Sequence, residues 1–223
     1  MTIITLLTDF GVVDTYVGVM KGVIAGIAPE ARVVDLTHDV PPQDIQAGAF
    51  HLLVAYRYFP VGTVHAAIVD PGVGTERAIV AVRAGGHTFI GPDNGLLRWA
   101  VDSAGGPEQA VRVENRDYSL PEVSATFHGR DVIAPAAAHL ARGLLLESLG
   151  PATGTLAGSP FPEPHAGHGV VVHVDRFGNC ITNLRPPAGE TVEVLGRRLP
   201  IVRTYPEVEG RQPIALVGSV RCV

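Results

Sequence analysis

The chain of 223 residues has few cysteines and no concentrated positive charge. Its two cysteines, Cys180 and Cys222, show neither the spacing of a metal site nor a disulfide framework. The formal net charge is −5, and without a run of Lys or Arg the sequence argues against nucleic-acid binding. No apolar stretch reaches the roughly 18 residues that a membrane span needs. We therefore expect neither nucleic acid nor a membrane as a partner.

The N-terminus also lacks the basic start and the cleavage site of a signal peptide, so we expect a cytoplasmic protein. A mildly acidic surface suits a cationic or neutral small substrate. Hydrophobic residues make up 46% of the chain, enough for a sizeable core in one large domain or one domain with a small appendage. The 26 glycines and 18 prolines predict many loops and tight turns.

Strand-like and helix-like segments alternate in the first part of the chain. Apolar runs at 3–7, 32–36 and 63–70 predict strands, separated by a helix that Asp14 or Thr15 caps and by a helix from 44 to about 56. This order is typical of an α/β domain with a mostly parallel sheet between layers of helices. Further along we predict a hairpin at 78–83 and 88–90, and helices around 96–101 and from 131 to about 142.

Prolines and glycines crowd the stretch 151–168, which predicts a linker. The preceding residues, 1–150, form the predicted α/β catalytic domain. Beyond the linker, short β-type segments at 170–174, 191–195, 199–202 and 214–217 predict a small all-β, barrel-like domain over residues 169–223.

Four aspartates lie at or near the ends of predicted strands, namely Asp9, Asp35, Asp70 and Asp175. In open parallel sheets, ligands bind in the crevice beyond the carboxyl ends of the strands. Aspartates there can bind a ribose diol, an amine or a metal, although aspartate at a strand end is also a common turn former. Asp9 and Asp70 are the stronger candidates, because a glycine-containing loop follows each of them.

Asp70, Arg77 and His128 together indicate a hydrolase. Asp70 ends a strand, Arg77 lies on the far side of the glycine-rich loop at 71–75, and His128 precedes a predicted helix. A carboxylate, a guanidinium and an imidazole can hold and polarise a water molecule if the fold brings them together. The alternatives are a structural salt bridge between Asp70 and Arg77 and an ordinary loop histidine.

Two weaker patterns remain. His128 and Asp131, with His38 and Asp39, are residue types that bind metals, but their spacing matches no zinc motif. Separately, the stretch 175–179 places an aromatic residue beside Gly and Asn, so it can stack on a planar ring while Asn hydrogen-bonds the ring's edge. The alternative for 175–179 is a tight turn with Asn in the left-handed conformation.

Five segments together are specific where each alone is not. With them the chain closely resembles the S-adenosyl-L-methionine (SAM) hydroxide adenosyltransferase family, the SAM hydrolases, which is related to the SAM-dependent fluorinase and chlorinase. The segments are Thr8-Asp9-Phe10-Gly11 with Asp14, Val69-Asp70-Pro71-Gly72-Val73-Gly74-Thr75 with Arg77, Gly91-Pro92-Asp93-Asn94-Gly95, Phe127-His128-Gly129-Arg130-Asp131, and Asp175-Arg176-Phe177-Gly178-Asn179.

The resemblance implies a fold, an assembly and a reaction. It implies an N-terminal α/β domain, a C-terminal barrel-like β domain, and a homotrimer with substrate between the N-terminal domain of one subunit and the C-terminal domain of the next. The implied reaction converts SAM and water to adenosine and L-methionine without a metal or a cofactor.

The resemblance also implies roles for residues. Asp70, Arg77 and His128 match the family's water-handling triad, and the halogenases differ because they lack its Asp and His. The substrate-binding residues are Asp9 at the ribose diol, Asp175 at the methionine amino group, and the pocket residues Phe177, Asn179 and Ser219. The family pattern continues through several strands beyond Val223, so we expect a shortened cover over the adenine. The alternatives are a non-catalytic SAM or adenosine binder, a halogenase-like enzyme and a metal-dependent hydrolase.

Overall fold

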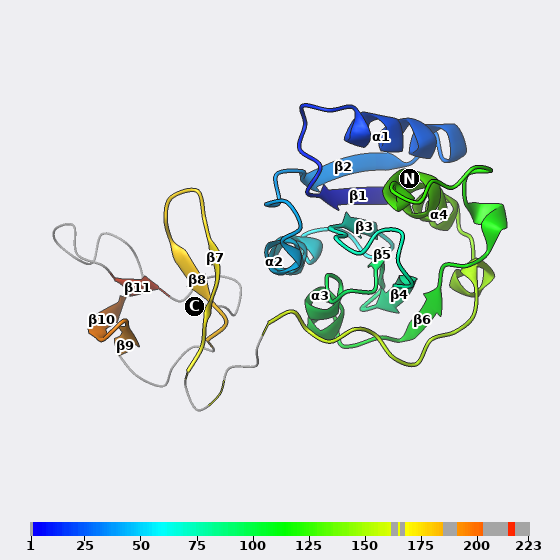
Figure 1. The fold of residues 1–223 in the computed structure, drawn as a ribbon. Helices are drawn as coiled ribbons and strands as arrows, with labels where there is room; N and C mark the ends of the chain where they lie inside the picture. Colours follow the sequence, from blue (N-terminus) through cyan, green and yellow to red (C-terminus); the bar gives the residue numbers. More distant parts are fainter. Residues whose placement is uncertain (1, 162–164, 166–167, 185–190, 203–213, 217–223) are drawn as a thin grey trace. The chain divides into compact units, whose positions relative to one another are not determined.

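The structure is a computed structural model that describes residues 2–161, 165, 168–184, 191–202 and 214–216. The chain divides into two compact units, Met1–Pro160 and Phe161–Val223 (Figure 1). Residues 151–157 belong to the first unit and hydrogen-bond to its earlier segments, where Thr153 N–H donates to the Ala110 carbonyl and Ala157 N–H donates to Asp93. The domain bounds expected from the sequence stay a prediction.

A six-stranded sheet forms the centre of the first unit, in the order β2-β1-β3-β5-β4-β6 (Figure 1). The pairs β1–β2, β1–β3 and β3–β5 are parallel, whereas β4 is antiparallel to both β5 and β6, so the mostly parallel sheet is confirmed. Only β6 was not expected from the sequence. The strands are β1 Ile3–Thr8, β2 Arg32–Thr37, β3 Val64–Ile68, β4 Ile79–Ala84, β5 His87–Pro92 and β6 Gln109–Arg112.

Two pairs of helices cover the sheet and give the predicted three layers (Figure 1). Helix α1 (Tyr16–Ile27) packs on α4 (Ala134–Ala141), and their apolar residues share one core with Ile4 and Leu6 of β1. Helix α2 (Ile45–Tyr56) packs on α3 (Arg98–Ser103) and covers the other face. A Cβ on Gly48 of α2 would lie 2.8 Å from Leu96 Cδ1, so glycine allows this close approach.

Local signals explain several element boundaries. Asp44 caps α2 by accepting a hydrogen bond of 2.9 Å from Ala47 N–H, as its residue type favours. Thr15 is the N-cap residue of α1, but its side chain makes no capping hydrogen bond. The β4–β5 hairpin turns at Gly85 and Gly86, where both glycines have positive φ.

The helix expected from 131 begins differently from its prediction. A π-helical turn over Gly129–Ile133 comes first, and α4 then starts with Pro135 in its first turn. His128 is the N-cap residue of the π-helical turn. Short 3₁₀ turns lie at Arg116–Tyr118 and Leu146–Leu149.

The second unit contains small sheets, which confirms the predicted β fold. In the described residues, β7 (Val171–Val174) pairs antiparallel with β8 (Cys180–Thr182), and a separate sheet has the order β11-β10-β9. The strands of that sheet are β9 Thr191–Val194, β10 Arg197–Val202 and β11 Ala215–Leu216. Strand β8 was not predicted. No helix in the described part of the chain is long and apolar enough to cross a membrane.

Candidate active site

The loops that follow β1 and β3 carry Asp9 and Asp70 at neighbouring strand ends. The segment that carries His128 reaches the same edge of the sheet, because Gly129 lies against the side chains of Ile68 and Phe10. This edge is where open parallel sheets bind their ligands.

Asp70, Arg77 and His128 form one connected group of side chains. Arg77 Nε donates to Asp70 Oδ1 at 2.9 Å, and Arg77 Nη2 donates to Asp70 Oδ2. The same Nη2 donates to His128 Nδ1 at 2.9 Å. Only 6% of the Asp70 side chain and 12% of the Arg77 side chain are exposed, so water competes little for these bonds. The fold therefore brings together the three residues that the sequence singled out.

The glycine-rich loop at 71–75 connects Asp70 to the segment before His128. Gly74 has a φ of 81°, and a Cβ there would lie 2.6 Å from the carbonyl oxygen of Ala125. Because a larger residue would be strained and would collide with Ala125, glycine allows the two loops to meet. The loop is closed internally, since Thr75 Oγ1 donates to the Gly72 carbonyl at 2.7 Å.

The hydrogen bond from Arg77 determines the tautomer of His128. A guanidinium can only donate, so His128 Nδ1 accepts and the neutral ring carries its hydrogen on Nε2. Burial and then the positive charge of Arg77 lower the pKa of His128, although Asp70 and Asp131 act in the opposite direction. His128 is therefore a neutral imidazole near pH 7 with its Nε2–H available as a donor.

A buried carboxylate holds the segment before His128 in place. Asp131 is fully buried, and its Oδ2 accepts from Ser124 N–H at 2.9 Å while its Oδ1 accepts from Arg130 Nε at 2.6 Å. Burial raises the pKa of Asp131, but the bonds from Arg130 and Ser124 outweigh burial and leave it below its ordinary value. Asp131 thus organises the backbone, and the described residues contain no group of three or more His, Cys, Asp or Glu side chains that could hold a metal.

Sequence reasoning missed two features beside Asp9. Gln43 N–H donates to Asp9 Oδ2 at 2.8 Å. Phe10, Tyr16 and Phe127 form an aromatic cluster with ring centroids 5.3 to 5.9 Å apart. Neither contact leaves a signal in the sequence, because each joins residues from different elements.

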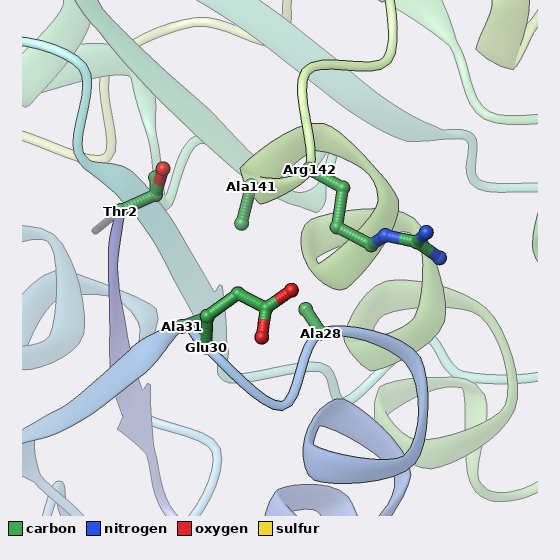
Figure 2. Close-up of a pocket in the computed structure, with 6 residues that line it drawn as sticks. All are labelled: Thr2, Ala28, Glu30, Ala31, Ala141 and Arg142. Carbon is green, nitrogen blue, oxygen red and sulfur yellow. The ribbon is translucent and has the colours of Figure 1, made fainter.

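Hollows are present in the first unit, and two of them can be compared with the expected site. One has a volume of about 290 Å³ and is lined by Arg77, Arg116 and His128. It therefore borders two of the three proposed catalytic residues, on the side where Val113 and Val132 also line it. The other, of about 270 Å³, lies before β1 and β2 at the opposite strand ends, between Glu30 and Arg142 (Figure 2). None of the residues expected in the site lines this second hollow.

In the second unit, Asp175 organises the turn between β7 and β8. Its Oδ1 accepts from the N–H groups of Phe177 and Asn179 at 2.8 and 2.9 Å, and its Oδ2 accepts from Asn179 Nδ2 at 2.7 Å. These bonds, the Asn179 side chain first, lower the pKa of Asp175. The left-handed residue of the turn is Gly178, with a φ of 86°, and not Asn179. Phe177 is 89% exposed, and Ser219 lies outside the described residues.

Family models match both parts of the chain. The SAM hydroxide adenosyltransferase N-terminal domain matches residues 4–150, and the C-terminal domain of the same family matches residues 169–223. An (R)-S-adenosyl-L-methionine hydrolase from Thermus thermophilus is 49% identical, with 96% of this chain and 87% of the relative covered. A fluorinase from an Actinoplanes species is 31% identical, with 82% and 71% covered.

The fold also matches a solved structure. The crystal structure of an uncharacterized conserved protein from Thermotoga maritima superposes with a TM-score of 0.90 at 32% sequence identity. The match covers 98% of this chain and 90% of that chain.

Proposed function

The chain belongs to the SAM hydroxide adenosyltransferase family, and we propose that it hydrolyses S-adenosyl-L-methionine to adenosine and L-methionine through Asp70, Arg77 and His128. The observation that carries the roles of these residues is the hydrogen-bonded group itself, in which one guanidinium binds both the carboxylate and the imidazole. The chain covers most of the length of the Thermus relative, so both of the family's domains bear on the proposal.

The reaction requires an aligned water molecule and a proton acceptor. A bond forms between the water oxygen and C5′ as the bond from C5′ to sulfur breaks, and its electron pair neutralises the sulfonium. The departing methionine is therefore a neutral thioether, so the leaving group needs no Lewis acid. Water must lose a proton for the product to be an alcohol, and a positioned base speeds such a step by about 10²–10⁴-fold.

We assign that proton to Asp70. Both nitrogens of neutral His128 are already committed, since Nδ1 accepts from Arg77 and Nε2 carries the hydrogen. A further proton on Nδ1 would break the Arg77 bond and place two cations side by side. Asp70 keeps free lone pairs on both oxygens, so it takes the proton while His128 Nε2–H orients the water. Arg77 holds Asp70 and His128 in this geometry, because it donates hydrogen bonds to both.

The substrate-binding residues follow the family pattern. We assign Asp9 to the ribose diol, Asp175 to the methionine amino group, and Phe177, Asn179 and Ser219 to the pocket. The family resemblance implies a homotrimer in which the substrate lies between domains of neighbouring subunits. The exposed side chains of Phe177 and Val13 are compatible with such contacts. Light scattering of the purified protein tests the trimer. The cytoplasmic location stays a prediction.

The name of the Thermus relative specifies the R configuration at the sulfonium, so we propose that this chain prefers the (R) epimer of SAM. The test is to incubate the protein with each epimer in water enriched in ¹⁸O and to analyse the products by chromatography and mass spectrometry. We expect L-methionine and adenosine with the label in its 5′-hydroxyl, formed faster from the (R) epimer and undiminished in excess chelator. Absence of adenosine above the enzyme-free blank contradicts hydrolysis.

The similarity to a fluorinase makes halide attack at C5′ the second candidate function. Asp70 and His128 favour water, because the family resemblance implies that the halogenases lack both residue types at the triad positions. The same incubation with chloride or fluoride distinguishes the two functions, since a 5′-halogenated nucleoside forms only if a halide replaces the water.

A further inference from the structure

The carboxylate of Asp9 is held by a segment that follows β2, at residues 38–43. Gln43 N–H donates to Asp9 Oδ2 at 2.8 Å, although 34 residues separate the two along the chain. This bond occupies one oxygen and leaves Oδ1 free to accept from a ligand. A carboxylate that is fixed in this way loses less conformational freedom when a ligand binds.

Two more hydrogen bonds connect the Asp9 loop to His38. Gly11 N–H donates to the His38 carbonyl at 2.8 Å, and the His38 ring places Nδ1 2.9 Å from Thr8 Oγ1. Thr8 is fully buried and His38 is 5% exposed, so solvent does not compete for this contact. Phe10 N–H also donates to Thr8 Oγ1, at 3.2 Å. The residues on both sides of Asp9 are thus bound to His38.

The backbone of Gln43 is strained in a way that serves this contact. Its φ is 65°, in the left-handed region, and among the described residues only Leu195 is another non-glycine with positive φ. Such a conformation costs on the order of 1 kcal/mol or more for a non-glycine residue, and strain of this kind is concentrated at functional sites. It lets the chain turn between the Gln43 N–H, which donates to Asp9, and Asp44, which caps helix α2.

His38 is in turn supported from its far side. Its Nε2 lies 3.1 Å from Asp35 Oδ1 without the alignment of a hydrogen bond, and Asp35 Oδ2 accepts from Lys21 at 2.6 Å. Burial raises the pKa of Asp35, but the hydrogen bond from Lys21 and the close contact with His38 outweigh burial and lower it, so the carboxylate stays charged beside the ring. The chain of contacts therefore extends from helix α1 to Asp9.

We propose that His38 and Gln43 are positioning residues for Asp9, which together fix Asp9 Oδ1 so that it accepts hydrogen bonds from the 2′,3′-diol of the adenosyl group. This inference rests on the proposed function and deepens it by adding two residues. The sequence pattern did not mark Gln43, and it marked His38 only as a residue type that binds metals. Neither residue needs to touch the substrate.

A matched pair of variants at Gln43 separates the effect of its backbone N–H from the effect of its side chain. Gln43→Gly keeps the left-handed conformation and so the N–H, whereas Gln43→Val disfavours it because a β-branched residue is strained at positive φ. The readout is the ratio of the inhibition constants of 2′,3′-dideoxyadenosine and adenosine against SAM hydrolysis by the full-length protein. We expect adenosine to bind more tightly to the wild type, the ratio to fall about tenfold in Gln43→Val, and the ratio to persist in Gln43→Gly.

A second pair at His38 decides the question if Gln43→Val does not fold. Asn places a polar atom near the position of Nδ1, so His38→Asn retains the ratio, whereas His38→Leu lowers it. A general loss of structure weakens both inhibitors alike and leaves the ratio unchanged. A wild type that hydrolyses SAM but binds both inhibitors equally, or variants that keep the wild-type ratio, overturn the inference alone. A wild type without hydrolysis overturns the proposed function and this inference with it.

Discussion

In the α/β unit the proposed catalytic side chains bind one another across distant segments. In the described part of the β unit, by contrast, Asp175 and Asn179 bind each other within one turn. Arg77 joins Asp70 to His128, which comes 51 residues later in the chain than Arg77. Asp175 instead accepts its hydrogen bonds from Phe177 and Asn179, two and four residues away. Only 6% of the Asp70 side chain is exposed, whereas Phe177 is 89% exposed.

This difference indicates a division of work between the units. Groups that act on the reacting atoms must be held in place before the substrate arrives, because reorganisation at the moment of reaction costs rate. Groups that recognise the remote end of a substrate need only a formed local structure, and their contacts complete on binding. Changes to Asp70, Arg77 or His128 should therefore lower kcat, and changes in the β turn should raise KM.

The largest effect is expected from Asp70→Asn. The amide retains the shape of the side chain but cannot take a proton, so kcat for SAM hydrolysis falls by about 10²–10⁴-fold with little change in KM. Steady-state kinetics by chromatography of adenosine measures the loss. A kcat within threefold of the wild type contradicts the role of Asp70 as proton acceptor.

The control for this variant is structural. Asp70→Asn weakens a partly buried ion pair, so its unfolding temperature has to be measured alongside its activity. Asp102→Asn removes the carboxylate of an exposed pair with Arg98 on helix α3, and we expect it to retain full activity. The comparison shows whether loss of an ion pair in this unit is enough to abolish turnover.

The next largest effect concerns the stability of the α/β unit in acid. His65 is fully buried between Thr5 and His87, and burial, with the charge of His87, lowers the pKa of His65 to about 3. The pKa in the folded state lies below the unfolded value of about 6.5, so the unfolded chain binds the proton more readily. The contribution of neutral His65 to stability is present above pH 6.5 and is lost as the pH falls toward 3, by roughly 5 kcal/mol in all.

Urea unfolding between pH 7 and pH 4 measures this loss, followed by the fluorescence of the single tryptophan, Trp99 on helix α3. His65→Leu lowers stability at pH 7, because Thr5 and His87 lose a partner, but it makes the decline with falling pH less steep. His168→Leu replaces an exposed histidine of the β unit, so its stability should decline with falling pH as steeply as that of the wild type. If stability declines equally steeply with falling pH in all three proteins, the decline is not due to His65.

Local signals in the sequence were enough for much of the fold. Asp44 marked the start of α2, and Gly85-Gly86 marked the hairpin, because a cap and a tight turn depend on neighbouring residues. Strands β6 and β8 were missed because they are only four and three residues long and carry no clear alternation. The π-helical turn after His128 was missed as well, since its residues suit an α-helix equally.

The candidate site was predictable only in part, because local signals in the sequence do not reveal contacts between distant segments. Asp70 could be found because it ends an apolar strand before a glycine-rich loop. The contact between Arg77 and His128 depends on how the chain folds back, and so does the bond from Gln43 to Asp9. A backbone N–H is present at every residue except proline, so no residue type could have indicated Gln43.

The smallest effect is expected at the β turn, from Asp175→Asn. The amide oxygen can still accept from the Phe177 and Asn179 N–H groups, so the turn persists while the negative charge is lost. A charged hydrogen bond to the methionine amino group contributes about 1.5–3 kcal/mol, so KM for SAM rises about 10–100-fold while kcat changes little. Inhibition by L-methionine weakens to the same degree, whereas inhibition by adenosine does not, because adenosine has no amino group of that kind. Equal weakening of both inhibitors places the damage in the fold of the β unit, and a lowered kcat at unchanged KM places Asp175 with the reacting atoms and removes the division between the two units.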